Sequence, residues 1–219
     1  MGISGTPADG HQAGADGQPQ AKQDVRREVL AARRELSAAA VEAAAAGMLD
    51  RLGALLAGRR GLTVCAYVPI GREPGGPDLP ERLAARPAVA RLLLPVLQPD
   101  LDLDWAAYTG PASLAEAARG LREPVGPAQG RAAIAGADLV LVPAVAVDRS
   151  GVRLGRGGGS YDRALARVSL ATPVAALLYD TELRDRLPAQ EHDQRVHVVV
   201  TPVRTAWLRP VPGWSPPDV

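Results

Sequence analysis

"DLVLVPAVAVDRSGVRLGRGGGSYDRALARV", residues 138–168, contains in order an apolar run, a turn, a glycine-rich bend and a helix-like segment. The apolar run 138–147 predicts a buried strand. The cluster "DRSG" (148–151) is typical of a turn. Four glycines then lie within residues 155–159, and the helix-like segment 160–168 follows them. A strand that leads through a glycine turn into a helix is typical of an α/β layered domain.

The same alternation continues along the rest of the chain. Residues 79–86 are helix-like, and residues 101–108 alternate polar and apolar, as a strand with one solvated face does. Short apolar runs predict further buried strands at 62–69, 90–96, 173–179 and 196–202. We therefore predict a single three-layer α/β domain, Rossmann-like, with a mainly parallel sheet covered by helices on both faces.

Two helices are expected before the first strand, over 21–35 and 38–57. Ser37 is a suitable N-cap for the second. One face of this second helix should pack on the core, because its apolar residues recur at steps of three and four, namely Val41, Ala45, Met48, Leu52 and Leu56.

Composition excludes several classes of function. The 219 residues include 25 Lys and Arg against 24 Asp and Glu, so no overall charge attracts the chain to nucleic acid or to an anionic membrane. No apolar run is long enough for a transmembrane helix. Cys65 is the single cysteine, and its apolar surroundings predict a buried structural thiol, which fits a reducing cytoplasm.

The two ends of the chain differ from its middle. Residues 1–20 are rich in Gly, Pro, Gln and Ala and lack the pattern of a signal peptide, so we expect a disordered tail. Residues 209–219 are Pro-rich and are expected to form a second tail. The α/β domain is then predicted to span 21–208.

The glycine-rich bend has the chemistry of a phosphate site. Glycines 155, 157, 158 and 159 allow positive φ and close approach of backbone N–H groups to an anion. The following helix adds its N-terminal amides, and Arg153 and Arg156 add charge-assisted hydrogen bonds. The alternative is a flexible loop with solvated arginines. The spacing of the glycines in the bend matches neither the dinucleotide-binding glycine motif nor a P-loop.

Ligands of parallel α/β sheets bind beyond the carboxyl ends of the strands, where neighbouring loops meet. The loops after the predicted strands 62–68 and 138–147 are therefore the expected place of the site.

With its flanks, "LVPAVAVDRSGVRLGRGGGSYDRALA" (141–166) resembles the signature of the 5-formyltetrahydrofolate cyclo-ligase family, also called methenyltetrahydrofolate synthetases. Three further stretches resemble the family in the same order, so that the resemblance extends over about 22–202. They are "KQDVR" (22–26), "YVPIGREP" (67–74) and "PAQEHDQRVHVVVTP" (188–202).

The resemblance implies a cytoplasmic ligase of one-carbon (folate) metabolism that uses ATP and Mg²⁺. Such an enzyme converts 5-formyltetrahydrofolate, a small reduced folate, into 5,10-methenyltetrahydrofolate. The formyl oxygen is phosphorylated and N10 then attacks the formyl carbon. This chemistry asks the protein mainly for positioning and charge neutralisation. A monomer is expected.

The resemblance also implies roles for individual residues. Arg156 and Tyr161 correspond to catalytic residues. Val68, Glu73 and the central part of the bend, Arg156 to Ser160, correspond to folate contacts. The ATP contacts would be Lys22, Arg26, Arg153, Leu154, Gly155, Arg156, Gly157, Gly158, Gly159, Ser160 and Tyr161.

Asp162 and Asp193 correspond to the family's Mg²⁺ contacts, and carboxylates combined with phosphates suit this cation. The residues alone leave alternatives open. Instead of binding a metal, Asp162 could simply complement the dipole of its helix. Asp193 could be an exposed loop acid. Without the resemblance, Glu73 beside Arg72 reads as a surface acid, and Lys22 and Arg26 read as a solvated helix face.

The sequence departs from the family pattern at Ser160, where a second aromatic residue is common. Two other functions remain open beside the cyclo-ligase. One is a sugar-phosphate isomerase, which would use the bend for a substrate phosphate. The other is a non-catalytic paralogue that binds folate or nucleotide without turnover.

Overall fold

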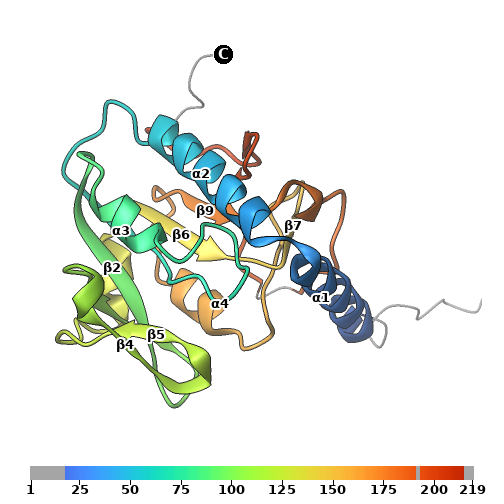
Figure 1. Ribbon diagram of the computed structural model, residues 1–219, viewed down its shortest axis with the longest axis horizontal. Helices are drawn as coiled ribbons and strands as arrows, with labels where there is room; N and C mark the ends of the chain where they lie inside the picture. The colour runs from blue at the N-terminus through green and yellow to red at the C-terminus, as the bar shows by residue number, and fades with distance from the viewer. Residues whose placement is uncertain (1–17, 191–192, 215–219) are drawn as a thin grey trace, which may run out of the picture.

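The computed structural model describes residues 18–190 and 193–214, and helices alternate with strands through most of this range (Figure 1). The α-helices are α1 (Gln18–Glu35), α2 (Ala38–Leu55), α3 (Leu79–Ala84) and α4 (Ser160–Leu165). Short 3-10 helices are η1 (Pro111–Ser113), η2 (Ala118–Gly120), η3 (Arg131–Gly136) and η4 (Asp180–Glu182). The Ser37 side chain accepts from the Ala40 N–H, so its predicted role as N-cap of α2 is confirmed.

The main sheet has seven strands in the order β12-β11-β9-β6-β1-β2-β3. The five central strands are parallel, and an antiparallel strand closes each edge. In chain order these strands are β1 (Leu62–Cys65), β2 (Val89–Leu97), β3 (Leu103–Ala107), β6 (Leu139–Pro143), β9 (Val174–Leu177), β11 (Val198–Val200) and β12 (Thr205–Trp207). After β1 the chain builds outward to β2 and β3, and later to β9 and β11 on the other side, so the winding direction reverses between β1 and β6.

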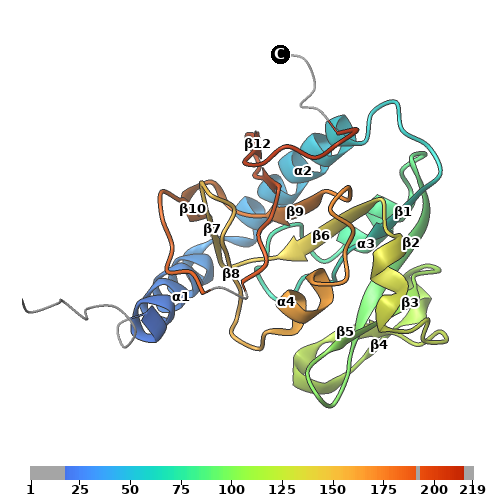
Figure 2. The same cartoon turned by 180° about the vertical axis from the view of Figure 1, so that it is seen from behind.

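Helices cover both faces of this sheet, which confirms the predicted fold class (Figures 1 and 2). Successive strand residues alternate between the two faces. Val64 belongs to the cluster that packs under α2 and α3, whereas its neighbour Cys65 belongs to the cluster under α4 and η3. Cys65 is fully buried, and this burial raises the pKa of its thiol to about 12, so the predicted structural role is confirmed.

Three sequence-based boundaries differ from the structure. The run 138–147 divides after Pro143, because its last residues form β7 (Ala146–Asp148), which leaves the main sheet. In a separate three-stranded sheet, β7 pairs with β8 (Arg153–Leu154) and β10 (Leu183–Arg184). Residues 18–20 are helical rather than part of a tail, and 1–17 lie outside the described residues. At the other end, Val211 and Trp214 pack into the core, so the folded unit extends beyond 208.

A small hairpin, β4 (Leu114–Glu116) with β5 (Arg122–Pro124), projects beyond the end of β2, at the lower side of the view in Figure 1. It was not expected from the sequence, because each strand has only three residues. One of its contacts to the main sheet is polar: the Glu123 carboxylate accepts the N–H of Leu97 at 2.9 Å.

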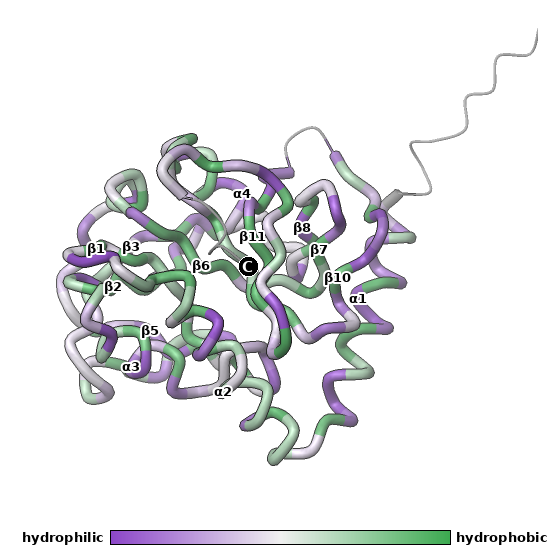
Figure 3. The backbone as a smooth tube through the Cα atoms, turned by 90° about the horizontal axis from the view of Figure 1, so that it is seen from above, coloured by the Kyte–Doolittle hydropathy of each residue, from purple (hydrophilic) through white to green (hydrophobic). Residues whose placement is uncertain are grey.

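Helix α1 lies beside the three-stranded sheet of β7, β8 and β10 (Figure 2). It is far more hydrophilic than strand β6 at the centre of the main sheet (Figure 3). Of the α1 side chains that the structure describes, only Val29 and Arg33 are buried. The Arg33 guanidinium donates to both carboxylate oxygens of Glu182, at 2.7 and 2.8 Å, and to the Ala144 carbonyl at 2.7 Å. Burial raises the pKa of Glu182, while the bond from Arg33 opposes this shift. These bonds hold α1 in place.

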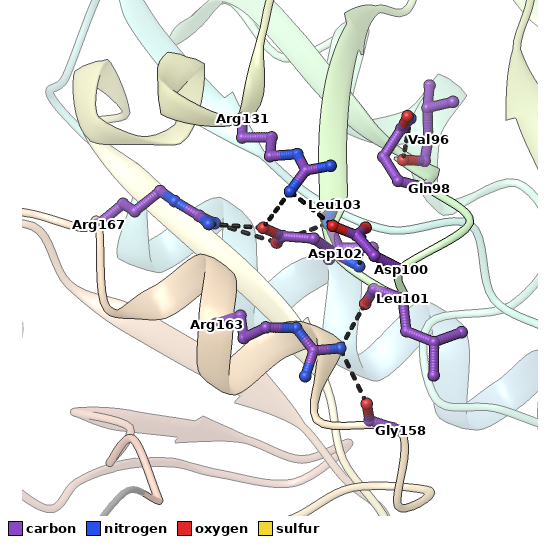
Figure 4. Close-up of polar contacts among 10 residues, drawn as sticks. All are labelled: Val96, Gln98, Asp100, Leu101, Asp102, Leu103, Arg131, Gly158, Arg163 and Arg167. Atoms are coloured by element: carbon purple, nitrogen blue, oxygen red, sulfur yellow. Dashed lines mark hydrogen bonds and ion pairs between the residues drawn. The ribbon is translucent and has the colours of Figure 1, made fainter.

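A second buried carboxylate, Asp102, fixes the turn between β2 and β3 against the end of α4 (Figure 4). Asp102 is 3 % exposed and accepts two bonds from Arg167, at 3.0 and 2.5 Å, and one from Arg131 at 3.2 Å. The Arg167 guanidinium is the main cause that lowers the pKa of Asp102 to about 2.

No helix in the described part of the chain combines the length and the apolar content that crossing a bilayer requires.

Replacing Arg33 by Met should lower the free energy of unfolding by about 3–5 kcal/mol, because the Glu182 carboxylate would stay buried without its partner. Arg149→Met is the matched control, since Arg149 pairs with Asp185 on the surface, and this variant should lose less than about 1 kcal/mol. Urea unfolding at pH 7 measures both values. Equal losses in the two variants would contradict the structural role of Arg33.

Replacing Asp102 by Asn should destabilise the protein in a pH-dependent way. The folded-state pKa of Asp102 lies below its ordinary value, so its contribution is complete above about pH 4 and is lost as the pH falls through about 2. Because Arg167 and Arg131 are partly exposed, we expect the contribution at pH 7 to be about 1–2 kcal/mol. The wild-type advantage in urea unfolding should shrink by about half between pH 7 and pH 3. A stability difference between wild type and Asp102→Asn that stays constant from pH 7 to pH 3 would contradict this role of the Asp102 carboxylate.

Candidate functional site

A pocket of about 520 Å³ opens at the carboxyl ends of β1 and β6. Tyr67 and Val68, just after β1, form part of its wall, and Pro143 to Val145, at the end of β6, form another part. Here the winding direction of the sheet reverses, and parallel α/β sheets bind ligands at such a point because the flanking loops diverge. The predicted location of the site is where this pocket lies.

The glycine-rich bend connects β8 to α4 and lines the pocket with all of residues 155–159. Gly157 (φ 106°) and Gly159 (φ 68°) adopt left-handed backbone conformations that disfavour other residues. Within the described residues, no backbone N–H from 155 to 159 donates a hydrogen bond to the protein. The bend therefore presents free amide donors beside a cavity, which is the chemistry that an anion needs.

Three arginines approach the bend where glycines leave room. A Cβ at Gly155 would lie 2.7 Å from Nη1 of Arg153, and one at Gly159 would lie 3.0 Å from Nη1 of Arg163. At Gly157 the nearest atoms would be the guanidinium of Arg26, at 3.7 Å. The glycines thus serve the approach of cationic side chains as well as the backbone conformation.

Helix α1 brings Lys22 and Arg26 to the pocket. Four-residue spacing places both on one face of the helix. The Arg26 Nε donates to the Gly155 carbonyl at 2.8 Å. The Lys22 ammonium lies 2.8 Å from the Asp193 carboxylate and 3.3 Å from the Gln190 side-chain oxygen. The two cations of α1 therefore lie at the pocket, Arg26 on the glycine bend and Lys22 on Asp193, and do not form a solvated helix face.

Glu73 is 6 % exposed and forms an ion pair with Arg156 at 2.9 Å. Its other oxygen accepts the Ile70 N–H at 2.9 Å. The interpretation of Glu73 as a surface acid paired with Arg72 is wrong, because its partner comes from the glycine bend. The Arg156 side chain stays half exposed, at 53 %, so its guanidinium retains donors that face the pocket opening.

Arg153 is more enclosed than the sequence indicates. Its side chain is 4 % exposed, and its Nη2 donates to the Asp162 carboxylate at 2.9 Å. The buried Nε of Arg153 has no acceptor among the described residues. The guanidinium also lies 5.7 Å from the centre of the Tyr161 ring. Arg153 therefore packs inside the wall of the pocket and orders Asp162 and Tyr161.

Tyr161 contributes a phenol to the pocket, and burial together with the nearby Glu73 carboxylate raises its pKa above the ordinary value. Tyr67 beside it is buried, donates to the Pro74 carbonyl at 2.7 Å, and also has a raised pKa because of burial. Both phenols thus stay protonated at neutral pH and act as hydrogen-bond donors rather than as bases.

Asp162 and Asp193 both line the pocket, each beside a cation, Arg153 and Lys22 respectively. The Gln194 N–H, next to Asp193, lies 3.4 Å from the Asp162 carboxylate, so the two acids come from adjoining segments. Across residues 18–190 and 193–214 no three His, Cys, Asp or Glu side chains are grouped to hold a metal by themselves. Two carboxylates are enough for a Mg²⁺ site when phosphate oxygens of a substrate supply further ligands, because Mg²⁺ is rarely coordinated by protein groups alone.

The structure brings every residue singled out for the site to this one pocket, whatever its role. They are Lys22, Arg26, Val68, Glu73, Arg153, Leu154, Gly155, Arg156, Gly157, Gly158, Gly159, Ser160, Tyr161, Asp162 and Asp193. Of the segment 188–202, residues 191–192 lie outside the described residues. The individual roles of these residues remain predictions.

Sequence reasoning missed the opposite wall of the pocket. The β4–β5 hairpin contributes Arg119, Leu121, Arg122 and Glu123, and the facing strands add Pro95, Leu97 and Leu103. Neither Arg119 nor Arg122 forms an ion pair with another described residue. The signal in the sequence is weak: two arginines on either side of a Gly-Leu pair, "RGLR" (119–122), form no motif that indicates a site.

Comparison with known proteins links this chain to a family. The model of the 5-formyltetrahydrofolate cyclo-ligase family matches residues 18–202. A 5-formyltetrahydrofolate cyclo-ligase from Mycolicibacterium smegmatis is 43% identical over 193 residues, which are 85% of this chain and 96% of that protein.

Solved structures show the same fold. The NMR structure of an Aquifex aeolicus 5,10-methenyltetrahydrofolate synthetase superposes with a TM-score of 0.70 at 30% identity and covers 90% of this chain and 96% of its own. A synthetase of the same name from Mycoplasma pneumoniae gives a TM-score of 0.65 at 21% identity, over 83% of this chain and 98% of that one, and supports the fold alone. The matching family model, the 43% identical relative and the shared fold show that the chain belongs to the 5-formyltetrahydrofolate cyclo-ligase family.

Proposed function

We propose that this chain converts 5-formyltetrahydrofolate into 5,10-methenyltetrahydrofolate with hydrolysis of ATP to ADP and phosphate. The observation that carries the proposal is one pocket that joins unpaired amides of the glycine bend, two cations of α1 and two carboxylates. Family membership names the reaction. The polar half of the pocket suits a polyphosphate, and the apolar half suits the flat rings of a folate.

The proposed reaction has two steps. The formyl oxygen first attacks the γ-phosphorus of ATP, and ADP leaves. N10 of the folate then attacks the formyl carbon, the carbon–oxygen bond breaks, phosphate departs, and the N10 proton is released. An amide oxygen is a poor leaving group and a phosphate is a good one, which is why the reaction needs ATP. The protein contributes no nucleophile, only positions and charge.

The free amides of the bend and the Lys22 and Arg26 side chains would bind the phosphates of ATP, because these donors already surround one part of the pocket. Arg156, oriented by Glu73, would stabilise charge on the transferred phosphoryl group. The protonated Tyr161 would donate a hydrogen bond in the same region.

Asp162 and Asp193 would hold Mg²⁺ together with phosphate oxygens. When bound, this ion would neutralise the negative charge of the phosphates. The ion pairs with Arg153 and Lys22 fix the positions of both carboxylates at the pocket.

The opposite wall gives the folate its direction. Val68, Leu97, Leu103 and Leu121 form apolar surface for the rings. A folate ends in a glutamate, whose carboxylates are anionic, and the β4–β5 hairpin offers Arg119 and Arg122 at the pocket wall. We therefore propose that the glutamate end lies at the hairpin and the formyl end at the glycine bend. Cytoplasmic location and a monomeric state stay predictions.

Purified chain with 5-formyltetrahydrofolate and Mg-ATP should produce the absorbance of the methenyl product together with one ADP per turnover. Omitting ATP should abolish the signal. Folded protein that binds both ligands without forming ADP would indicate the non-catalytic paralogue, and ATP-independent turnover of a sugar phosphate would indicate the isomerase.

Arg156→Met should lower kcat/KM for ATP by about 100-fold or more, since a charged donor at the transferred group is lost. The surface variant Arg149→Met should keep wild-type kinetics, and thermal unfolding should show that both variants fold. Unchanged ATP kinetics in Arg156→Met would remove Arg156 from the reaction.

Replacing Arg119 and Arg122 together by Met should raise KM for the folate about tenfold while KM for ATP stays within twofold, because only the folate is proposed to reach the hairpin. Steady-state kinetics with each substrate varied in turn measures both constants. A larger increase in KM for ATP than for the folate would reverse the proposed orientation of the two ligands.

A further inference from the structure

Arg163, on α4, connects the glycine bend to the turn between β2 and β3 (Figure 4). Its Nη2 donates to the Leu101 carbonyl at 2.7 Å and to the Gly158 carbonyl at 3.0 Å. Neither Arg163 nor Leu101 is part of the pocket wall, whereas Gly158 and Gly159 are. The guanidinium thus holds the bend from outside the pocket.

The bond from Arg163 to the Gly158 carbonyl also affects the orientation of the Gly159 N–H, which belongs to the same peptide group. A trans peptide is planar, so the Gly159 N–H points in the direction opposite to the Gly158 carbonyl. With the carbonyl drawn toward Arg163, the N–H is directed away from Arg163. Glycine on both sides of this peptide makes other orientations sterically accessible, so the sequence of the bend alone does not fix this orientation.

The other end of the connection is rigid. Leu101 holds φ 64°, which is unusual for a residue other than glycine, and its N–H donates to the Gln98 carbonyl at 2.9 Å. The next residue is the buried Asp102, which Arg167 and Arg131 hold. Arg163 therefore ties a peptide between two glycines to a turn that the Leu101–Gln98 bond and the buried Asp102 hold in place.

We propose that Arg163 is a positioning residue that keeps the Gly158–Gly159 peptide oriented with its N–H toward the phosphate oxygens of the nucleotide. This assignment rests on the proposed function, since it concerns the ATP part of the same pocket. Arg163 contacts no reacting atom and acts only through the orientation of one backbone amide. Arg163 lies within the stretch 141–166 that resembles the family signature, but the resemblance implies no role for it.

The test compares wild type with Arg163→Met, which keeps the length of the side chain but donates no hydrogen bond, and Arg163→Lys, whose ammonium can still donate to two carbonyls. In the ligand-free protein, ¹⁵N relaxation should give rigid amides at Gly158 and Gly159 in wild type and lower order parameters in Arg163→Met. Calorimetric affinity for Mg-ADP should fall three- to tenfold in Arg163→Met, and Arg163→Lys should recover most of both properties.

Kinetics separates positioning from general destabilisation. KM for ATP should rise in Arg163→Met by the same three- to tenfold, while KM for the folate stays within twofold and the thermal midpoint stays close to that of Arg149→Met. Wild-type order parameters and Mg-ADP affinity in Arg163→Met would overturn the positioning role and leave the proposed function standing. A wild-type chain that binds Mg-ADP but lacks turnover would overturn the proposed function alone, because the relaxation and affinity differences would still identify Arg163 as the residue that orders the bend.

Discussion

The geometry of the pocket depends on how α1 is held against the rest of the domain. This helix buries little apolar surface, so its position is set largely by the hydrogen bonds of Arg33 to Glu182 and to the Ala144 carbonyl. Ala144 is itself part of the pocket wall. Lys22 and Arg26 lie three and two turns before Arg33, on the same face of the helix. One buried guanidinium therefore places two cations beside the glycine bend.

The site combines a rigid sheet frame with a glycine-rich bend that arginines hold in place. The frame is the reversal point of a buried parallel sheet, where the ends of β1 and β6 diverge. The bend is a glycine-rich segment whose amides donate to no described residue, and arginine side chains approach it where the glycines lack a Cβ. Its conformation is set from three sides, by Arg26 on α1, Arg153 inside the wall and Arg163 from α4. The cationic side chains around the pocket therefore have two roles: some hold the backbone of the glycine bend, and others line the cavity.

The sequence predicted the fold class and the place of the site because both follow local patterns. Buried parallel strands are continuous apolar runs, and a glycine cluster after such a strand marks a ligand loop at its carboxyl end. Long-range pairings were beyond this reasoning. Nothing local distinguishes Glu73 from a surface acid, and its burial depends on Arg156, 83 positions later. The division of the run 138–147 and the burial of Trp214 likewise depend on partners that only the folded chain supplies.

A crystal structure with Mg²⁺ and a non-hydrolysable ATP analogue tests the central claim most directly. We expect the phosphates to lie against the amides of residues 155–159, between Lys22 and Arg26, with the ion between Asp162 and Asp193. A nucleotide bound elsewhere, with the glycine bend in contact only with solvent, would contradict the account.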